Sequence, residues 1–442
     1  MAGTWIGLAF MPVQRAHSRA YLAVILGRRP RLIEVWRHFF AFAEFLMLKL
    51  RVGRGVPMRC EFVAVNPVDF KTLDETDRPA LFGTFHFGCS DLLGYLLGAR
   101  GRSVSIIRLR VDNSDDTRWL GQRFSDKVSF LWVNDPANLL FDIKAAIEAG
   151  KHVFAEKPLA VDAPGIRSVL ASAHLAKQKN LALQVGFCWR YAEAEKATFE
   201  RINQGAVGDI VTVHSTYHTG TLSARPRQPQ WSEMEFQLRN WWHFAWVSGD
   251  HIVEQAVHSI DRLAWALGDR LPLRCNALGG RAARTGEESG HAFDHFAVVY
   301  EYEGGRRCFH TCRQIDGCPS DNTDYIYGTK GSCTVNGWTP LHTIKDLAGK
   351  ELWKYEGPKR DMYQNEHDAL FASIRAGTPI NDCERGANST LMAIMGRMAA
   401  YTGQTITWEQ AMNSQEDLSP ARYEFSDLPK PPVAVPGKTK FV

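Results

Sequence analysis

Chemistry is most readily assigned to Glu156-Lys157-Pro158, which directly follow the short apolar run 152–155. This run predicts a β-strand, and the triplet would lie at its carboxyl end. Ligands of open α/β sheets bind at the carboxyl ends of strands, so a lysine at this position could act on a substrate. Proline restricts its own backbone and that of the preceding residue, which predicts an extended Lys157.

A second set of titratable side chains lies in the run 248–261. Glu254, His258 and Asp261 are spaced i, i+4 and i+7, which places them on one face if the run is helical. A solvated surface stripe is one interpretation of this pattern. The preceding aromatic segment, residues 241–246, favours the other, a polar cavity with aromatic walls that could hold a sugar ring.

A third candidate is the pair His86 and Asp91, at the junction of a predicted strand and helix. A histidine can accept the proton of an attacking hydroxyl, and a carboxylate can fix the tautomer of that histidine. The alternative is that Asp91 caps the helix and His86 is a satisfied residue at the strand end. Spacing alone favours this second interpretation.

The elements that position these residues change character along the chain. Before residue 150, helices alternate with strands, which is an α/β pattern. The predicted helices are 16–26, 32–50, 91–100, 116–124 and 136–149, and the predicted strands are 56–65, 79–87, 103–110 and 128–134. The helix that ends at Gly150 leads into the strand before Lys157.

After residue 150 the pattern becomes α+β. Helices are predicted at 161–179, 192–204 and 385–402, with a strand at 181–189. Extended runs then follow at 210–218, 272–278, 294–303, 306–314, 323–328, 332–336, 341–345 and 351–355. Their spacing predicts a large, mostly antiparallel sheet.

Composition places the chain among ordinary globular proteins, with 45% apolar and 23% charged residues. Nine scattered cysteines favour a reducing compartment, and a cytoplasmic location is expected. Cys308, His310 and Cys312 alternate like one face of a strand, so we expect a structural role for them and no metal site. A nucleic-acid partner is not expected.

Positive charge is concentrated at the start of the chain. Residues 1–60 contain ten Lys and Arg against two acidic residues, and 32–50 has a broad apolar face. A solvated helical face is the common meaning of such a bias. It also suits peripheral contact with anionic lipid at the inner membrane face. The sequence contains no run of 18 apolar residues, so no membrane-spanning helix is expected.

The stretch "AGKHVFAEKP" and the run 248–261 closely resemble the Gfo/Idh/MocA family of NAD(P)-dependent oxidoreductases, and the resemblance covers about residues 143–420. It implies a sugar or polyol substrate, NAD or NADP as cofactor, and a homo-oligomer formed through the large sheet. By resemblance, Lys157 and His258 are the catalytic pair and Glu254 is their acidic partner. Glu156, Lys157 and Pro158 would contact the cofactor. The implied substrate-binding residues are Arg190, Tyr191, Trp242, His243 and Asp261.

One departure from that family concerns the cofactor. A dinucleotide site needs a glycine-rich turn between a strand and a helix, so that backbone amides can reach the pyrophosphate. No G-x-G-x-x-G occurs in the sequence. We therefore predict weak or absent NAD(P) binding and an oxidoreductase-type site with little or no turnover.

About residues 10–151 resemble instead the N-terminal half of the late lipid A, or lysophospholipid-type, acyltransferases, through segments such as "LFGTFHFGCSDLLGYLL". This implies His86 as general base and Asp91 as its orienting carboxylate. An acyltransferase is the second functional hypothesis, and a non-catalytic binding protein is the third. The predicted division is an acyltransferase-like segment (1–150), a remnant of a dinucleotide-binding domain (151–205), a substrate-binding sheet domain (206–420) and a tail (421–442).

Overall fold

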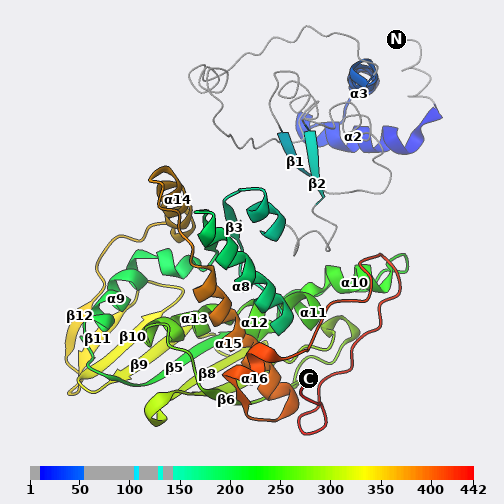
Figure 1. Cartoon of the computed structure of the whole chain (residues 1–442). Helices are drawn as coiled ribbons and strands as arrows, with labels where there is room; N and C mark the ends of the chain where they lie inside the picture. The colour runs from blue at the N-terminus through cyan, green and yellow to red at the C-terminus, as the bar shows by residue number, and fades with distance from the viewer. Residues whose placement is uncertain (1–9, 54–103, 109–127, 133–142) are drawn as a thin grey trace. The chain divides into compact units, whose positions relative to one another are not determined.

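The computed structural model describes residues 10–53, 104–108, 128–132 and 143–442. The chain divides into two compact units, Met1–Asp135 and Pro136–Val442, which are described separately (Figure 1). His86 and Asp91 lie outside the described residues, as do the predicted strands and helices between residues 54 and 103. The acyltransferase hypothesis therefore stays a prediction.

In the first unit, the described residues form two helices and a parallel strand pair. Helices α2 (Pro12–Leu26) and α3 (Leu32–Gly53) are joined by a hydrogen bond of 2.7 Å between Ser18 Oγ and His38 Nδ1. Strands β1 (Val104–Arg108) and β2 (Val128–Trp132) pair in parallel. These four elements confirm the helices predicted at 16–26 and 32–50 and the strands predicted at 103–110 and 128–134. Among the described helices, none is long and apolar enough to span a membrane.

The second unit begins with helical residues 143–148, which end at Gly150 as predicted. Gly150 has φ 74°, and its N–H donates to the carbonyl of Ile147 at 3.0 Å. This left-handed conformation favours glycine and closes the helix. Strand β3 (Val153–Ala155) follows and pairs in parallel with β4 (Leu183–Val185), and α8 (Ala163–Gln178) connects them. The strand predicted at 181–189 is shorter than expected, because the chain turns into the 3₁₀ helix η2 (Cys188–Tyr191).

A nine-stranded sheet forms the base of the unit and confirms the predicted large, mostly antiparallel sheet. Its order is β12-β11-β10-β9-β5-β8-β7-β6-β13, and only the β5–β8 pair is parallel. The strands are β5 (Ile210–Thr219), β6 (Arg274–Gly280), β7 (His295–Glu301), β8 (Arg307–Gln314), β9 (Thr323–Gly328), β10 (Gly331–Asn336), β11 (Thr343–Asp346), β12 (Glu351–Lys354) and β13 (Ile406–Thr407). Along β8, Cys308, His310 and Cys312 point to the same buried face, as their alternation predicts.

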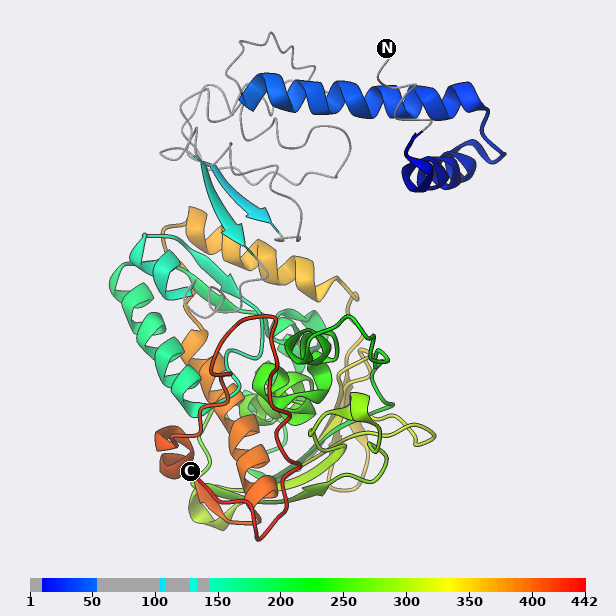
Figure 2. The same ribbon diagram turned by 90° about the vertical axis from the view of Figure 1, so that its right-hand side faces the viewer.

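Helices cover one face of this sheet (Figures 1 and 2). Helices α12 (His251–Glu254), α13 (Val257–Ala266) and α15 (Cys383–Thr402) pack directly on it, and α16 (Trp408–Asn413) lies at its β13 edge. Other helical elements of residues 193–375 are α9 (Glu193–Asn203), α10 (Glu233–Arg239), the 3₁₀ turn η3 (Trp241–His243), α11 (Ala245–Ser248) and α14 (Met362–Arg375), of which α14 packs on η2. A single hydrophobic core runs from Ile147 to Ala411 and joins β3, β4 and α8 to the sheet. The fold therefore holds Lys157 and the sheet domain on one packed body.

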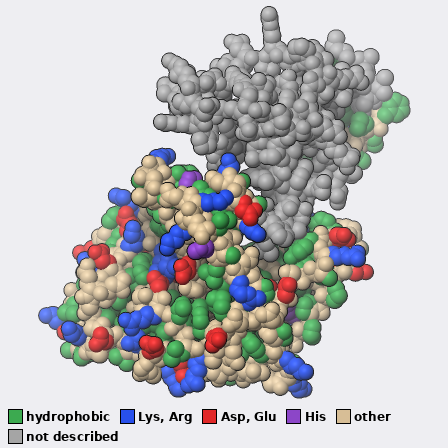
Figure 3. Space-filling model, in the orientation of Figure 1, with side chains coloured by type: hydrophobic (Ala, Val, Ile, Leu, Met, Phe, Trp, Pro, Cys, Tyr) green, Lys and Arg blue, Asp and Glu red, His purple; other side chains and the backbone are tan. Residues whose placement is uncertain are grey.

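The C-terminal residues 421–442 lie against this body and cross the helices of residues 233–266 (Figure 2). The carbonyl of Ser426 accepts from the N–H of Met234 at 3.2 Å, and that of Leu428 accepts from Gln237 Nε2 at 3.4 Å. On the face in Figure 3, acidic and basic side chains of the second unit are interspersed.

Candidate active site

Lys157 extends from the end of β3 to the end of α12. Its Nζ donates to the backbone carbonyl of Glu254 at 2.5 Å and lies 3.3 Å from Glu254 Oε1. The two side chains are 16% and 9% exposed, so the ion pair is largely shielded from water. Burial raises the pKa of the Glu254 carboxyl, and the Lys157 ammonium opposes that rise. The structure thus brings together two of the predicted catalytic residues.

His258 lies in the first turn of α13, between two aromatic rings. Its ring centroid is 4.7 Å from that of Trp189 and 5.9 Å from that of Phe187. Burial, followed by the charges of Lys157 and Arg262, holds the pKa of His258 well below its ordinary value of 6.5. Its Nδ1 is buried with no hydrogen-bond partner among the described residues. A neutral imidazole in this position can accept a proton from a substrate.

The predicted single helix through Glu254, His258 and Asp261 is wrong. Helix α12 ends at Glu254 and α13 begins at Val257, so the three side chains do not follow one stripe. Glu254 pairs with Lys157, whereas Asp261 is directed to a separate buried cluster.

Arg190 is the main partner of Asp261. The guanidinium of Arg190 donates from Nε to Asp261 Oδ2 at 2.8 Å and from Nη2 to Oδ1 at 2.9 Å. Ser389 Oγ donates to the same carboxylate at 2.8 Å. Arg190 also binds Asp269 at 2.6 Å. These contacts join η2, α13 and α15, and they occupy the polar groups that were predicted to bind substrate.

Replacing Asp261 by alanine is expected to lower the free energy of unfolding by about 3–5 kcal/mol, because a buried arginine would lose its main counter-charge. Asp269 is the matched control, since it pairs with the same Arg190 but is 38% exposed against 2% for Asp261. Because Asp269 has φ 58°, its carboxylate is removed by Asp269→Asn, which tolerates this left-handed conformation and should cost about 0–1 kcal/mol. Urea unfolding of both variants measures the difference, and equal midpoints would contradict a structural role for Asp261.

The remaining predicted substrate-binding residues lie outside the lining of the cavity next to His258. The hydroxyl of Tyr191 donates to Asp382 Oδ2 at 3.3 Å. Trp242 stacks on Trp241, with ring centroids 3.6 Å apart. His243 is buried, and burial lowers its pKa to about 4. The structure does not bring these three residues together with His258, and their binding role stays a prediction.

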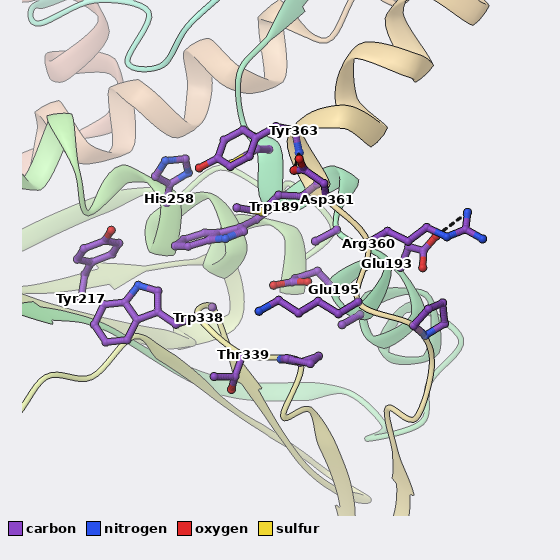
Figure 4. A pocket seen from close by; sticks show the side chains of 18 residues that line it. Trp189, Glu193, Glu195, Tyr217, His258, Trp338, Thr339, Arg360, Asp361 and Tyr363 are labelled. Atoms are coloured by element: carbon purple, nitrogen blue, oxygen red, sulfur yellow. Dashed lines mark hydrogen bonds and ion pairs between the residues drawn. The ribbon is translucent and has the colours of Figure 1, made fainter. Parts of the chain in front are cut away.

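A cavity of about 460 Å³ opens beside His258 (Figure 4). Four aromatic side chains from separate segments form its walls: Trp189, Tyr217, Trp338 and Tyr363. In Figure 4 the hydroxyl of Tyr363 points toward the His258 ring. Flat apolar walls of this kind suit the C–H face of a sugar or polyol ring. Sequence reasoning missed Tyr217, Trp338 and Tyr363, because only the tertiary fold brings them together.

The polar lining of the cavity is mainly acidic. Glu193, Glu195 and Asp361 line it, together with Lys359 and Arg360. Glu193 Oε1 and Arg360 Nη1 form an ion pair of 3.4 Å, drawn as a dashed line in Figure 4. Hydroxyl groups of a ligand would therefore meet several hydrogen-bond acceptors.

The strand-to-helix junction after β3 offers no free glycine amide for a phosphate. Lys157 and the exposed Glu156 stand at the carboxyl end of β3, and the peptide bond before Pro158 is cis. The following strand-to-helix junction, however, starts α8 with Asp162. The Asp162 carboxylate accepts hydrogen bonds from the N–H of Gly165 at 2.9 Å and from the N–H of Leu418 at 3.0 Å. Those amides are not free to bind a pyrophosphate, so this junction does not fit one.

Comparison with known proteins identifies the sheet domain. Residues 196–334 match the family model described as the GFO/IDH/MocA C-terminal domain. Inositol 2-dehydrogenase of Pseudomonas fluorescens (strain SBW25) is 32% identical over 246 residues, which are 53% of this chain and 63% of the relative. Trans-1,2-dihydrobenzene-1,2-diol dehydrogenase of Mus musculus is 26% identical over 207 residues, 47% of this chain and 54% of the relative.

The fold is also found among solved structures. Aldose-aldose oxidoreductase from Caulobacter crescentus, complexed with glycerol, superposes with a TM-score of 0.52 at 16% identity, covering 69% of this chain and 91% of that one. The chain spans roughly half the length of the curated relatives it matches, from 54% to 63% for the two named above. Residues 196–334 thus resemble the GFO/IDH/MocA C-terminal domain, and the activity of the whole chain is a matter for proposal.

Proposed function

We propose that residues 143–442 form the substrate-binding part of an NAD(P)-dependent oxidoreductase that acts on a hydroxyl of a sugar or polyol. The observation that carries the proposal is an aromatic-walled cavity lined by His258, with the Lys157–Glu254 ion pair near enough to lower the pKa of that histidine although it lies outside the lining. The relatives support the same chemistry, because their names give an inositol and a cyclic diol as substrates.

Each side chain has a role that its geometry supports. Lys157, fixed by Glu254 outside the cavity lining, would donate to the oxygen of a substrate whose reacting end extends past His258. His258 takes the hydroxyl proton, since its ring is neutral and its Nδ1 has no partner among the described side chains. A bound nicotinamide would supply the hydride acceptor. Trp189 and Tyr217 hold the ring of the substrate.

The test is formation of reduced nicotinamide when the full-length chain is incubated with cyclic polyols or aldoses and millimolar NAD or NADP. Millimolar nucleotide is needed because weak cofactor binding is expected. Absence of reduction with every polyol at high nucleotide would reject the oxidoreductase proposal for the intact chain.

We also propose that α2 and α3 contact anionic lipid. Val13, Tyr21 and Leu32 are exposed on these helices, and Arg29 and Arg31 are exposed in the turn between them. Apolar side chains can enter a bilayer interface while arginines bind lipid phosphates. The full chain should float with phosphatidylglycerol vesicles and not with phosphatidylcholine vesicles.

A double Arg29→Glu, Arg31→Glu variant should lower partition into the anionic vesicles about tenfold or more, because each basic residue contributes about 1 kcal/mol. Equal flotation with both vesicle types would contradict the lipid proposal.

The uncovered face of the sheet is proposed to form a homo-oligomer. Leu278, Phe309 and Tyr327 are exposed there, which is unusual for large apolar side chains on a free surface. Light scattering should give a multiple of the chain mass, and Phe309→Glu should shift the mass toward the monomer. A monomeric wild type would contradict this expectation.

A further inference from the structure

Glu195 is a buried carboxyl group that faces the His258 cavity. It lies in the first turn of α9 and is only 5% exposed. Figure 4 shows its carboxylate pointing into the space between Trp189 and Thr339. Its position is distinct from the Lys157–Glu254 pair, which is not part of the cavity lining.

The Glu195 carboxylate accepts from its own backbone N–H, and no other side chain in the described part of the chain donates a hydrogen bond to it. The Nε2 atom of His342 is 3.9 Å from Glu195 Oε1, beyond hydrogen-bonding range. That imidazole is already engaged by Thr198 Oγ1 at 2.8 Å and by the carbonyl of Asn336 at 3.1 Å.

The nearby Arg262 is committed to other partners. It is fully buried, donates from Nε to Asp324 and from Nη2 to Asn322 Oδ1 at 2.6 Å, and stacks 4.2 Å from the centroid of the Trp189 ring. One guanidinium thus stands near two buried carboxylates and hydrogen bonds with one of them. Burial raises the pKa of Glu195 to about 7, although Arg262 opposes the rise.

A largely buried carboxylate that accepts from its own backbone N–H still has unused acceptor capacity, so its further hydrogen bonds are expected to come from whatever fills the cavity. A carboxyl group that titrates near neutrality can accept from a hydroxyl or donate to one. Hydroxyl groups of a ring stacked on Trp189 meet this need, whereas an apolar ring edge would leave the group unpaired.

We propose that Glu195 is the specificity-determining residue of the cavity, binding a hydroxyl on the side of the substrate ring away from the reacting carbon. The inference rests on the proposed function and narrows its substrate to an uncharged cyclic polyol. A cyclic diol, whose far edge has no hydroxyl, would leave Glu195 unsatisfied.

The experiment compares two ligands and three variants. myo-Inositol carries hydroxyls all round its ring, whereas cyclohexane-1,2-diol has the two vicinal hydroxyls and none on the far edge. Binding to the full-length chain is followed by quenching of tryptophan fluorescence, without nucleotide, so the result does not depend on turnover. The variants are Glu195→Ala, Glu195→Gln and Glu193→Gln, the last at the Arg360 ion pair.

Glu195→Ala should weaken inositol binding about 10- to 100-fold, the range for a hydrogen bond to a charged group, and leave diol binding unchanged. Glu195→Gln keeps the shape of the side chain and some of its hydrogen bonds, so its affinity for inositol should lie between those of the wild type and the alanine variant. It also provides a test if the alanine variant misfolds. Glu193→Gln should change inositol binding by less than either.

The outcomes separate the two proposals. Inositol binding that depends on Glu195, without any nicotinamide reduction, would support the specificity role and reject the oxidoreductase activity. Equal losses for inositol and diol, no loss for inositol, or no binding of inositol by the wild type would each overturn the role of Glu195.

Discussion

Replacement of His258 by asparagine is expected to lower kcat/KM for polyol oxidation by about 10²–10⁴-fold, the usual contribution of a general base. Asparagine keeps a polar side chain of similar size but cannot accept the substrate proton. Inositol binding measured by fluorescence should change far less than kcat, because the walls of the cavity remain. The measurement is initial-rate kinetics at millimolar nucleotide.

His291→Asn is the matched control. Burial lowers the pKa of both histidines, that of His291 to about 4. His291, however, does not line the cavity. Its replacement should leave kcat near the wild-type value in protein with an unchanged circular dichroism spectrum. Equal losses in the two variants would show that the effect on rate comes from packing.

The pH dependence follows from the direction of the His258 shift. Because the folded pKa is well below 6.5, the ring stays neutral as the pH falls from about 8 to about 6. Proton acceptance is lost only at more acidic pH. The measurement is kcat/KM as the pH is lowered, for the wild type and for His258→Asn. If the wild-type value halved near pH 6.5 and the variant showed no such step, a lowered pKa of His258 would be contradicted.

NAD and NADP are expected to bind with dissociation constants in the millimolar range or not at all. A dinucleotide brings two phosphate charges, which a Rossmann site meets with glycine amides at a helix N-terminus. The strand-to-helix turn that the sequence predicts for this role, His86-Phe-Gly-Cys-Ser-Asp91, lies outside the described residues and has one glycine and a carboxylate. Losses of one or two kcal/mol from repulsion and from hindered approach would together weaken binding roughly 10²-fold or more.

Nicotinamide mononucleotide gives a sharp comparison, because it lacks the adenosine half and the pyrophosphate. If only the nicotinamide end fits, it should bind about as well as NAD. Micromolar affinity for NAD or NADP, with much weaker binding of the mononucleotide, would show that another part of the chain binds the phosphates.

The sheet was predictable because its strands alternate. Along β8 every second residue is buried, and this period marks the strand in the sequence without any tertiary information. Helix α14 was not predicted, although Asp361 offers a capping signal: its carboxylate accepts from the N–H of Tyr363 at 3.0 Å. The break after Glu254 was also hidden, because polar residues at helical spacing on two short helices look the same in sequence as on one.

The site was predictable only in part. Lys157, Glu254 and His258 follow from local motifs, and the structure places them near one another. Arg190 and Asp261 look equally suited to binding substrate, because the sequence shows the type of each residue but not that the two side chains pair with each other. The walls of the cavity depend on sheet order, which sets Tyr217 of β5 near Trp338 after β10, with ring centroids 6.2 Å apart.

The Arg190–Asp261–Ser389 cluster has a mechanical consequence. Because it ties η2, α13 and α15 together inside the core, a hinge movement between these elements would pull a buried ion pair apart, at a cost of several kcal/mol. The segments 337–340 and 358–361 form the other side of the cavity and belong to no helix or strand. Substrate should therefore enter and leave past these two loops while the helices stay in place, and the rate of exchange should respond to substitutions in the loops more than to changes at the η2–α13 junction.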